Sequence, residues 1–210
     1  MTANNSGELE KGVDDLKLSL DTNILSRLLQ YLRLLVKWNR VYNLTAIRED
    51  RKLVSHHLLD SLAVMPYLVS TSLVDVGSGA GLPGVPLAIA NPSLRVVLLD
   101  SNHKKAAFLR QVAVELKLDN IEIVTDRSQQ WRPAERLDQV VSRAFSDLPG
   151  FVDAALHLCA PDGRLLAMKG VFPHEEIEQL PAGVRLQSVI PLAVPGLNAV
   201  RHLVVLQPSV

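Results

Sequence analysis

The sequence has few of the features that mark secreted, membrane-bound or strongly charged proteins. Its 210 residues include one cysteine, Cys159, which excludes an intrachain disulfide framework and suits a reducing cytoplasm. No apolar run reaches the roughly 18 residues that a membrane span requires. The polar start, MTANNSGELEKG, lacks the apolar segment of a secretion signal. Because the formal net charge is zero, bulk charge does not indicate a nucleic-acid partner. We expect a cytoplasmic protein without membrane contact.

Charge is nevertheless uneven along the first quarter of the chain. Residues 1–21 carry five acids and two bases, a net charge of −3, whereas residues 22–57 carry seven bases and two acids, a net charge of +5. The basic segment can contact phosphates, but it can equally be the solvated face of a helix. On charge alone, the solvated face is the simpler interpretation.

A strand, a glycine-rich loop and a helix follow one another in residues 73–89, LVDVGSGAGLPGVPLAI. The apolar, β-branched run 73–76 fits a buried strand, and Gly77, Gly79 and Gly81 follow at a spacing of two residues. Glycine allows a sharp turn and lets a ligand approach the main chain without a Cβ in the way. The helix behind the loop offers unpaired N–H groups and a partial positive charge. The segment therefore predicts a loop that binds a nucleotide-like ligand.

The spacing of the glycines bears on which nucleotide binds. A dinucleotide fingerprint would place its third glycine at position 82, which is Leu82 here. Instead, Asp75 stands two places before Gly-x-Gly-x-Gly, a pattern that resembles the first motif of class I S-adenosylmethionine-dependent methyltransferases. Asp100 ends the next predicted strand, where a carboxylate accepts hydrogen bonds from a ribose diol. An ordinary glycine turn between a strand and a helix is the alternative.

Apolar patterning divides the chain into helices first and alternating strands and helices afterwards. We expect a flexible segment over residues 1–20, a helical extension of two helices over residues 21–70, and a cofactor-binding domain over residues 71–210. Two strands near residues 184–194 and 201–207 should form an antiparallel pair at the end of that domain. The fold class is therefore α/β: a Rossmann-like, mostly parallel seven-stranded sheet with a terminal antiparallel strand, as in class I methyltransferases.

Polar side chains gather at the carboxyl ends of the predicted strands, where ligands bind in open α/β sheets. Ser128 and Gln129 follow the third strand, at the place where an adenine ring would rest. Arg143 follows the fourth strand, and its guanidinium can pair with the methionine carboxylate, with a substrate phosphate or only with a surface carboxylate. Lys169, at the end of the fifth strand, can contact RNA phosphate or simply cap the strand.

Two segments of the helical extension carry polar groups that suit either nucleic-acid binding or structure. Residues 37–43, KWNRVYN, mix bases, amides and aromatic rings, which can stack on nucleobases and bond their edges but can also pack a helix end. His57 shares a helix face with Asp60 and Ser61. No third ligand accompanies them, so we expect no metal; a structural hydrogen bond and a polar wall of the active cleft both stay open.

Methyl acceptors that need a dedicated catalytic side chain are disfavoured. Enzymes that methylate exocyclic amines carry an Asn or Asp, two prolines and an aromatic residue after strand four, where this chain has residues 142–145, SRAF. Cytosine carbon-5 methylation needs a cysteine nucleophile, but Cys159 lies at a predicted helix end and is better explained as a small buried core residue. A ribose hydroxyl needs a Lys-Asp-Lys-Glu arrangement, which Lys169 alone does not make. Elimination favours an acceptor that is already nucleophilic, such as a purine ring nitrogen.

Five motifs together resemble one family, over about residues 20–207. They are, in order, residues 37–45 (KWNRVYNLT), 57–61 (HLLDS), 75–84 (DVGSGAGLPG), 142–145 (SRAF) and 201–205 (RHLVV). The resemblance is to the bacterial ribosomal RNA small subunit methyltransferase G family, also called glucose-inhibited division protein B. It implies N7 methylation of one guanine in 16S ribosomal RNA, with S-adenosylmethionine as methyl donor and no general base. It also favours the RNA-facing interpretation of the basic N-terminal helices.

The resemblance implies site residues as well. By family resemblance, cofactor contacts fall on Gly77, Leu82, Ser128, Gln129 and Arg143, and the loop and second strand add Gly79 and Asp100. RNA contacts are expected from Lys37, Asn39, Arg40, His57 and Lys169. The expected partner is 16S ribosomal RNA in the context of the small ribosomal subunit.

One departure from the family concerns the adenine contact. The family often has an acidic residue near the positions of Ser128 and Gln129. The adenine assignment holds if that contact uses main-chain groups and not if it uses a carboxylate. A small-molecule methyltransferase with the same cofactor, and a non-catalytic RNA-binding or cofactor-sensing module, are the alternative functions. The basic, aromatic-bearing N-terminal helices disfavour the first of these.

Overall fold

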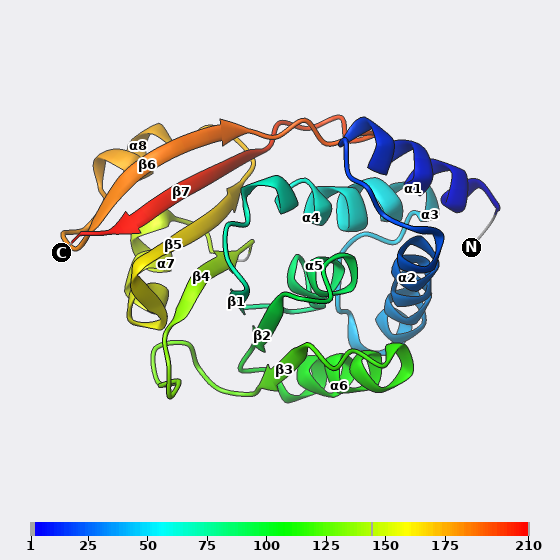
Figure 1. The fold of residues 1–210 in the computed structure, drawn as a ribbon, viewed down its shortest axis with the longest axis horizontal. Helices are drawn as coiled ribbons and strands as arrows, with labels where there is room; N and C mark the ends of the chain where they lie inside the picture. Colours follow the sequence, from blue (N-terminus) through cyan, green and yellow to red (C-terminus); the bar gives the residue numbers. More distant parts are fainter. Residues whose placement is uncertain (1–2, 144, 210) are drawn as a thin grey trace.

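A seven-stranded sheet runs through the middle of the molecule, in the order β3-β2-β1-β4-β5-β7-β6 (Figure 1). The structure is a computed structural model that describes residues 3–143 and 145–209. The strands are β1 (Ser72–Val76), β2 (Arg95–Leu99), β3 (Ile121–Val124), β4 (Leu137–Ser142), β5 (Cys159–Lys169), β6 (Val184–Pro191) and β7 (His202–Pro208). Strands β1 to β5 are parallel to their neighbours among themselves, whereas β7 pairs antiparallel with both β5 and β6. The predicted sheet is confirmed.

The strand order reverses at β1, which pairs with β2 on one side and with β4 on the other. In open α/β sheets the carboxyl ends of the strands separate at such a point, which leaves room for a ligand. The glycine loop leaves β1 at this place. The topology alone therefore puts the loop beside the ends of β2 and β4.

Helices cover both faces of the sheet (Figure 1). They are α1 (Ala3–Asp15), α2 (Thr22–Tyr42), α3 (Asp50–Leu53), the π-helical turn η1 (Val54–Leu59), α4 (Asp60–Leu62), the 3-10 turn η2 (Met65–Tyr67), α5 (Gly84–Ala90), α6 (His103–Leu116), α7 (Leu148–Ala155), the 3-10 turn η3 (Leu156–Leu158) and α8 (His174–Glu178). Two apolar clusters result, one under α2, η1, α5 and α6 and the other under α7. In the described part of the chain, no helix is long and apolar enough to cross a membrane.

The N-terminal segment is helical where the sequence predicted a flexible stretch. Leu9 and Val13 of α1 are buried, and Gly12 leaves no room for a side chain because Leu59 of η1 packs against it. The prediction of a flexible segment over residues 1–20 is therefore wrong for residues 3–15. A short polar helix holds its place here because its few apolar side chains are buried against a helix distant in sequence, an effect that composition does not reveal.

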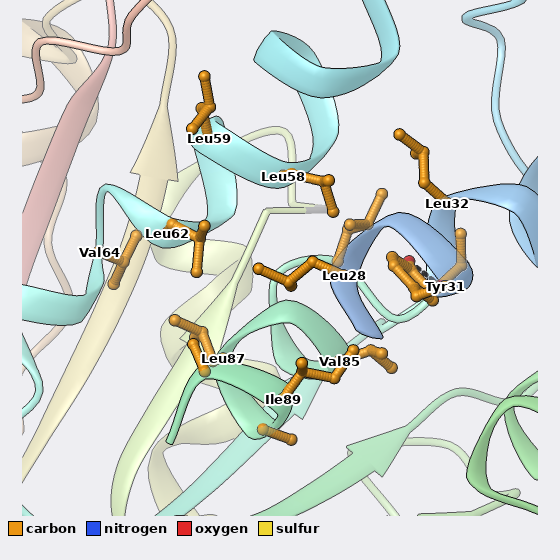
Figure 2. Packing of buried hydrophobic residues seen from close by; sticks show 14 of the residues in the cluster. Leu28, Tyr31, Leu32, Leu58, Leu59, Leu62, Val64, Val85, Leu87 and Ile89 are labelled. Atoms are coloured by element: carbon orange, nitrogen blue, oxygen red, sulfur yellow. Dashed lines mark hydrogen bonds between the residues drawn. The ribbon is translucent and has the colours of Figure 1, made fainter. Parts of the chain in front are cut away.

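Helix α2 is capped at both ends. The Asp21 carboxylate accepts a hydrogen bond from the Ile24 N–H at 2.8 Å, which caps the first turn. Asn43 takes the left-handed conformation that ends the helix. Figure 2 shows the apolar face of α2, with Leu28 and Tyr31, meeting side chains from η1, α4 and α5. One core therefore joins the predicted helical extension to the predicted cofactor-binding domain, and the division at residues 70 and 71 stays a prediction.

Candidate active site

The glycine loop after β1 has the backbone conformation that its sequence predicts. Gly77, Gly79 and Gly81 have φ angles of 71°, 58° and 86°, values that L side chains rarely adopt. The N–H groups of Gly77 and Ser78 both donate to the Leu99 carbonyl at the end of β2, at 2.9 and 3.1 Å. The buried Tyr31 hydroxyl donates to the Ala80 carbonyl at 2.7 Å. The loop is thus fixed from the sheet on one side and from α2 on the other.

Asp75 fastens the start of α5 to β1. Its side chain is fully buried, and its Oδ2 accepts a hydrogen bond from the Gly84 N–H at 2.8 Å. A Cβ on Gly84 would lie only 2.8 Å from the same oxygen, so glycine is required there. Burial raises the pKa of Asp75 to about 7, although the hydrogen bond from Gly84 opposes this rise. Asp75 is therefore a positioning residue whose charge depends on pH near neutrality.

Replacing Asp75 with asparagine should change how stability depends on pH. An acid whose pKa rises from 3.8 to about 7 on folding keeps its proton in the folded protein while the unfolded chain loses it. The free energy of unfolding therefore falls as pH rises from about 4 to 7. Chemical denaturation at several pH values should show that the free energy of unfolding falls less with rising pH in Asp75→Asn than in the unaltered protein. The two falls should differ by up to roughly 4 kcal/mol at pH 8. Identical profiles for the two proteins would contradict this account.

A first cavity, of about 370 Å³, opens beside the glycine loop at the carboxyl ends of β1, β2 and β3. It is lined by Val76, Gly77, Leu99, Asp100, Ser101, Lys105, Asp126, Arg127, Ser128, Gln129 and Phe145. The Asp100 carboxylate lies at its wall and accepts hydrogen bonds from the N–H groups of Gly79 and Asn102, both at 2.8 Å. Each carboxylate oxygen has two lone pairs. The carboxylate is therefore oriented by the main chain and keeps acceptor capacity for a ribose diol.

The predicted cofactor residues fall into three groups. Gly77, Asp100, Ser128 and Gln129 line the first cavity, and Gly79 is bonded to Asp100 beside it. Leu82 is a buried core residue. Arg143 lines a second cavity, and its neighbour Ala144 is outside the described residues. The structure thus gathers four of the predicted residues at one cavity, and their cofactor contacts stay a prediction.

Three groups in the first cavity carry chemistry that sequence reasoning did not assign. Asp126, two residues before Ser128, puts a carboxylate in the wall. An acidic residue therefore lies near Ser128 and Gln129, where the sequence analysis expected this chain to depart from the family. Phe145 adds an aromatic ring that is itself packed on Phe151 at 5.5 Å. The Lys105 ammonium lies 3.7 Å from the Asp100 carboxylate. Their positions two to six residues beyond strand ends were the available signal.

A second cavity, of about 430 Å³, opens at the carboxyl ends of β4 and β5. Arg143 lines the second cavity, and Phe145, two residues later, lines the first. The second cavity is lined by Thr45, Ala46, Ile47, His56, His57, Asp60, Arg143, Met168, Lys169, Gly170 and Arg201. Three cations and one acid give it a balance of +2. An anionic substrate is favoured in such a cavity.

Asp60 organises the cations of the second cavity. Its side chain is 1% exposed, its Oδ2 accepts from Arg143 Nη1 at 3.0 Å, and its Oδ1 accepts from Arg201 Nε at 2.9 Å. Arg143 also donates to the His56 carbonyl at 3.2 Å. One carboxylate thus joins the N-terminal helices, the end of β4 and the segment before β7. We refer to Asp60, Arg143 and Arg201 as the arginine clamp.

The two histidines of the second cavity are weak bases. Burial, together with the charge of Arg143, lowers the pKa of His57 to about 4. Burial and the charge of Lys52 also lower the pKa of His56 below its usual range. The His57 Nε2 lies 3.3 Å from the Thr45 hydroxyl. Both rings are therefore neutral at pH 7 and poorly suited to remove a proton from a substrate.

The predicted RNA-binding residues differ in accessibility. Lys37 and Arg40 are exposed on α2. The Asn39 side chain is buried and accepts from the Thr45 N–H at 2.9 Å, so it holds the chain that follows α2. His57 is buried beneath Thr45, as described above. Lys169 pairs with Glu176 at 2.8 Å and donates to the Ser146 carbonyl at 2.7 Å.

The aromatic residues of the segment 37–43 pack a helix end. Trp38 stacks on Tyr42 at 5.2 Å and contacts Phe108 of α6 at 5.7 Å. Trp38 is half-buried, whereas Tyr42 is 42% exposed. Of the two roles that the sequence left open for this segment, packing is therefore the main role of its aromatic rings. The basic side chains of the segment, Lys37 and Arg40, are exposed.

Cys159 is far from the chemistry. It is the first residue of β5 rather than part of a helix end, it is buried, and burial raises the pKa of its thiol to about 12. The prediction of a small core residue is confirmed. It borders a cavity of about 810 Å³ at the amino ends of β4 and β5. Ligand chemistry in this fold belongs at the opposite edge.

The site fits S-adenosylmethionine. The left-handed φ angle of Gly77 places loop backbone in the wall of the first cavity, and the Asp100 carboxylate in the same wall suits a ribose diol. Together with a sheet ending in an antiparallel β7, these features define a class I S-adenosylmethionine-dependent methyltransferase. Among residues 3–143 and 145–209, no group of His, Cys, Asp and Glu side chains is placed to hold a metal ion.

Comparison with known proteins gives the family. Residues 24–204 match the family model described as GidB, rRNA small subunit methyltransferase G. The chain is 54% identical over 200 residues to ribosomal RNA small subunit methyltransferase G of Chromobacterium violaceum, which covers 95% of this chain and 96% of the relative. It is 51% identical over 211 residues to the protein of that name from Nitrosospira multiformis, with 97% and 98% coverage. The chain belongs to this family, so the predicted family and enzyme class are confirmed.

Solved structures support the fold independently. The chain matches TrmN from Thermus thermophilus with a TM-score of 0.58 and 18% identity, covering 81% of this chain and 53% of that one. It matches a SAM dependent methyltransferase from Aquifex aeolicus with a TM-score of 0.56 and 18% identity, covering 75% and 93%. At such low identity these likenesses concern the fold alone. They agree with the predicted fold class.

Proposed function

We propose that this protein transfers a methyl group from S-adenosylmethionine to N7 of one guanine in 16S ribosomal RNA. S-adenosylmethionine is the methyl donor of the family, and it supplies an electrophilic sulfonium methyl group when bound. The observation that carries the proposal is the second cavity: it is cationic, its wall residue Arg143 is two residues from Phe145 in the wall of the first cavity, and its histidines are weak bases. Both oxygens of Asp60 are paired with arginines, and the pKa of His57 is near 4.

A guanine N7 suits such a cavity because it needs no deprotonation. Its lone pair lies in the plane of the ring and can attack a methyl group in line, so correct placement supplies much of the rate. An amine or hydroxyl acceptor must lose a proton, for which the second cavity offers no competent base. The task left to this chain is to hold the base beside the cofactor and to keep it there.

The cations around the site suit the RNA backbone. Arg143 and Arg201 are each about one-quarter exposed at the second cavity, and Lys37 and Arg40 are exposed on α2. Arginine matches phosphate geometry with two parallel hydrogen bonds. We expect Asn39 and His57 to act indirectly, by fixing Thr45 at the cavity wall. The small ribosomal subunit is the proposed physiological context.

Nucleoside mass spectrometry tests the proposal. Ribosomal RNA from cells with and without the gene should differ by one 7-methylguanosine in the 16S molecule, and purified protein with S-adenosylmethionine should restore it. Parallel assays on naked 16S RNA and on isolated small subunits should show preferred methylation of one of them. An unchanged 7-methylguanosine content would overturn the proposal. Cofactor turnover on small molecules, or RNA binding without turnover, would then support one of the two alternatives.

A further inference from the structure

Exposed apolar side chains gather at one rim of the second cavity. Val171 is 75% exposed, Phe172 41% and Val200 61%. Val171 and Val200 are next in sequence to Gly170 and Arg201, which line the cavity, and Phe172 follows Val171. The two segments meet where Lys169 of β5 pairs with His202 of β7. We refer to Val171, Phe172 and Val200 as the apolar rim.

The Phe172 ring is held in place although much of it is exposed. His174 lies against it with ring centroids 4.2 Å apart, and the His202 ring meets it edge-on at 5.6 Å and 81°. His202 is itself fixed, because its Nδ1 bonds the Gly170 carbonyl at 2.8 Å. The His174 N–H donates to the Phe172 carbonyl at 3.1 Å. A ring that is already ordered loses little conformational entropy when a ligand stacks on it.

We propose that Phe172 is a stacking platform for an unpaired RNA base next to the guanine in the second cavity. This inference rests on the proposed function and specifies how that substrate is held. Nucleobases stack on aromatic side chains with little regard to sequence, and a target guanine can enter a cavity only from an unstacked strand. The platform and the cavity together select a single-stranded or splayed segment of RNA.

Charge around the apolar rim favours nucleic acid and sets its direction. On the cavity side, Arg143 and Arg201 offer cations to phosphates. Beyond Phe172 along the chain, Glu175 and Glu178 of α8 are exposed acids that repel phosphates. The RNA backbone should therefore pass over Gly170 and Arg201 rather than along α8. A protein partner is the alternative occupant of an exposed apolar surface, and the test below separates it from RNA.

The test uses substitutions at Phe172 and three readouts. Phe172→Ala should raise the KM for RNA and weaken binding of a short single-stranded RNA, followed by fluorescence anisotropy, by roughly tenfold. The kcat and the affinity for S-adenosylmethionine should stay close to those of the unaltered protein. Phe172→Tyr should restore RNA binding, because the ring is kept. Val114→Ala, at a 74% exposed position on α6, is the matched control and should change nothing.

Two outcomes would overturn the inference. Equal RNA affinity of Phe172→Ala and the unaltered protein would show that Phe172 is not a stacking platform. Restored binding by Phe172→Leu would show that the contact is nonspecific apolar burial, as a protein partner requires, and not stacking. Failure of the proposed function gives a different result: no RNA is methylated by any form of the protein. RNA binding measured by anisotropy reports on Phe172 in that case too.

Discussion

Replacing Gly79 with valine is expected to reduce the affinity for S-adenosylmethionine by roughly 100-fold. Gly79 has a φ angle of 58°, at which a β-branched residue is strongly disfavoured. The strain amounts to about 1–3 kcal/mol. Relieving it would turn the N–H away from the Asp100 carboxylate, which now accepts it at 2.8 Å, and a hydrogen bond to a charged group is worth about 1.5–3 kcal/mol. Every 1.4 kcal/mol is about tenfold in affinity.

Isothermal titration calorimetry measures this loss directly, and a thermal unfolding curve shows whether the variant is folded. The matched control is Gly7→Val, because Gly7 lies in α1, lacks a left-handed φ angle and has open space where a Cβ would stand. The cofactor affinity of Gly79→Ala should lie between those of the unaltered protein and Gly79→Val, since the alanine Cβ would meet only ordinary contacts, the nearest at 3.7 Å. A folded Gly79→Val protein that binds the cofactor normally would refute the role assigned to the glycine loop.

The features of the candidate site that can be predicted from sequence are those that one short segment of the chain determines. A strand followed by glycines at alternate positions and a helix determines the turn locally, so Gly77 and Gly79 have the expected conformation. Asp100 was predicted from its distance along one strand-helix-strand unit. Connections in such units are short and of one hand.

The parts that sequence did not predict depend on contacts between distant residues. Asp60 and Arg201 are 141 residues apart and form a 2.9 Å hydrogen bond, a pairing that no spacing rule contains. Helix α1 buries Leu9 and Val13, and Leu59 of η1 packs against its Gly12, contacts that the sequence of α1 alone does not contain. A polar composition indicates flexibility until such a partner is known.

Polar residues in the helical extension show a further limit of sequence reasoning. Asn39 and His57 stand in motifs that resemble those of an RNA-binding family, yet both side chains are buried and bond the residues around Thr45. Sequence shows that a polar side chain is present but not whether it faces solvent or the protein. The exposed aromatic ring of Phe172 went unnoticed for the opposite reason, since it follows a strand end without any surrounding motif.

Replacing Asp60 with asparagine should destabilise the protein and impair catalysis together. Removing one partner of a buried ion pair costs about 3–5 kcal/mol. Asp60 is buried, but Arg143 and Arg201 are 29% and 25% exposed and can regain some water, so we expect about 2–3 kcal/mol. For a domain of this size that lowers the Tm by about 5 to 10 °C. Methyl transfer should fall as well, because both arginines of the clamp lose their fixed position beside the second cavity.

Differential scanning calorimetry and a methyl-transfer assay on the same samples separate the two effects, provided that activity is measured well below the lowered Tm. The matched control is Glu122→Gln, which breaks an ion pair with Arg95 on the surface; such pairs contribute about 0–1 kcal/mol, so this variant should keep its Tm within a few degrees. Asp60→Asn and Arg201→Gln share one contact, so their combined loss of stability should be smaller than the sum of the separate losses. Additive losses, or an Asp60→Asn protein with unaltered Tm and turnover, would show that the clamp does not join the helical extension to the active site.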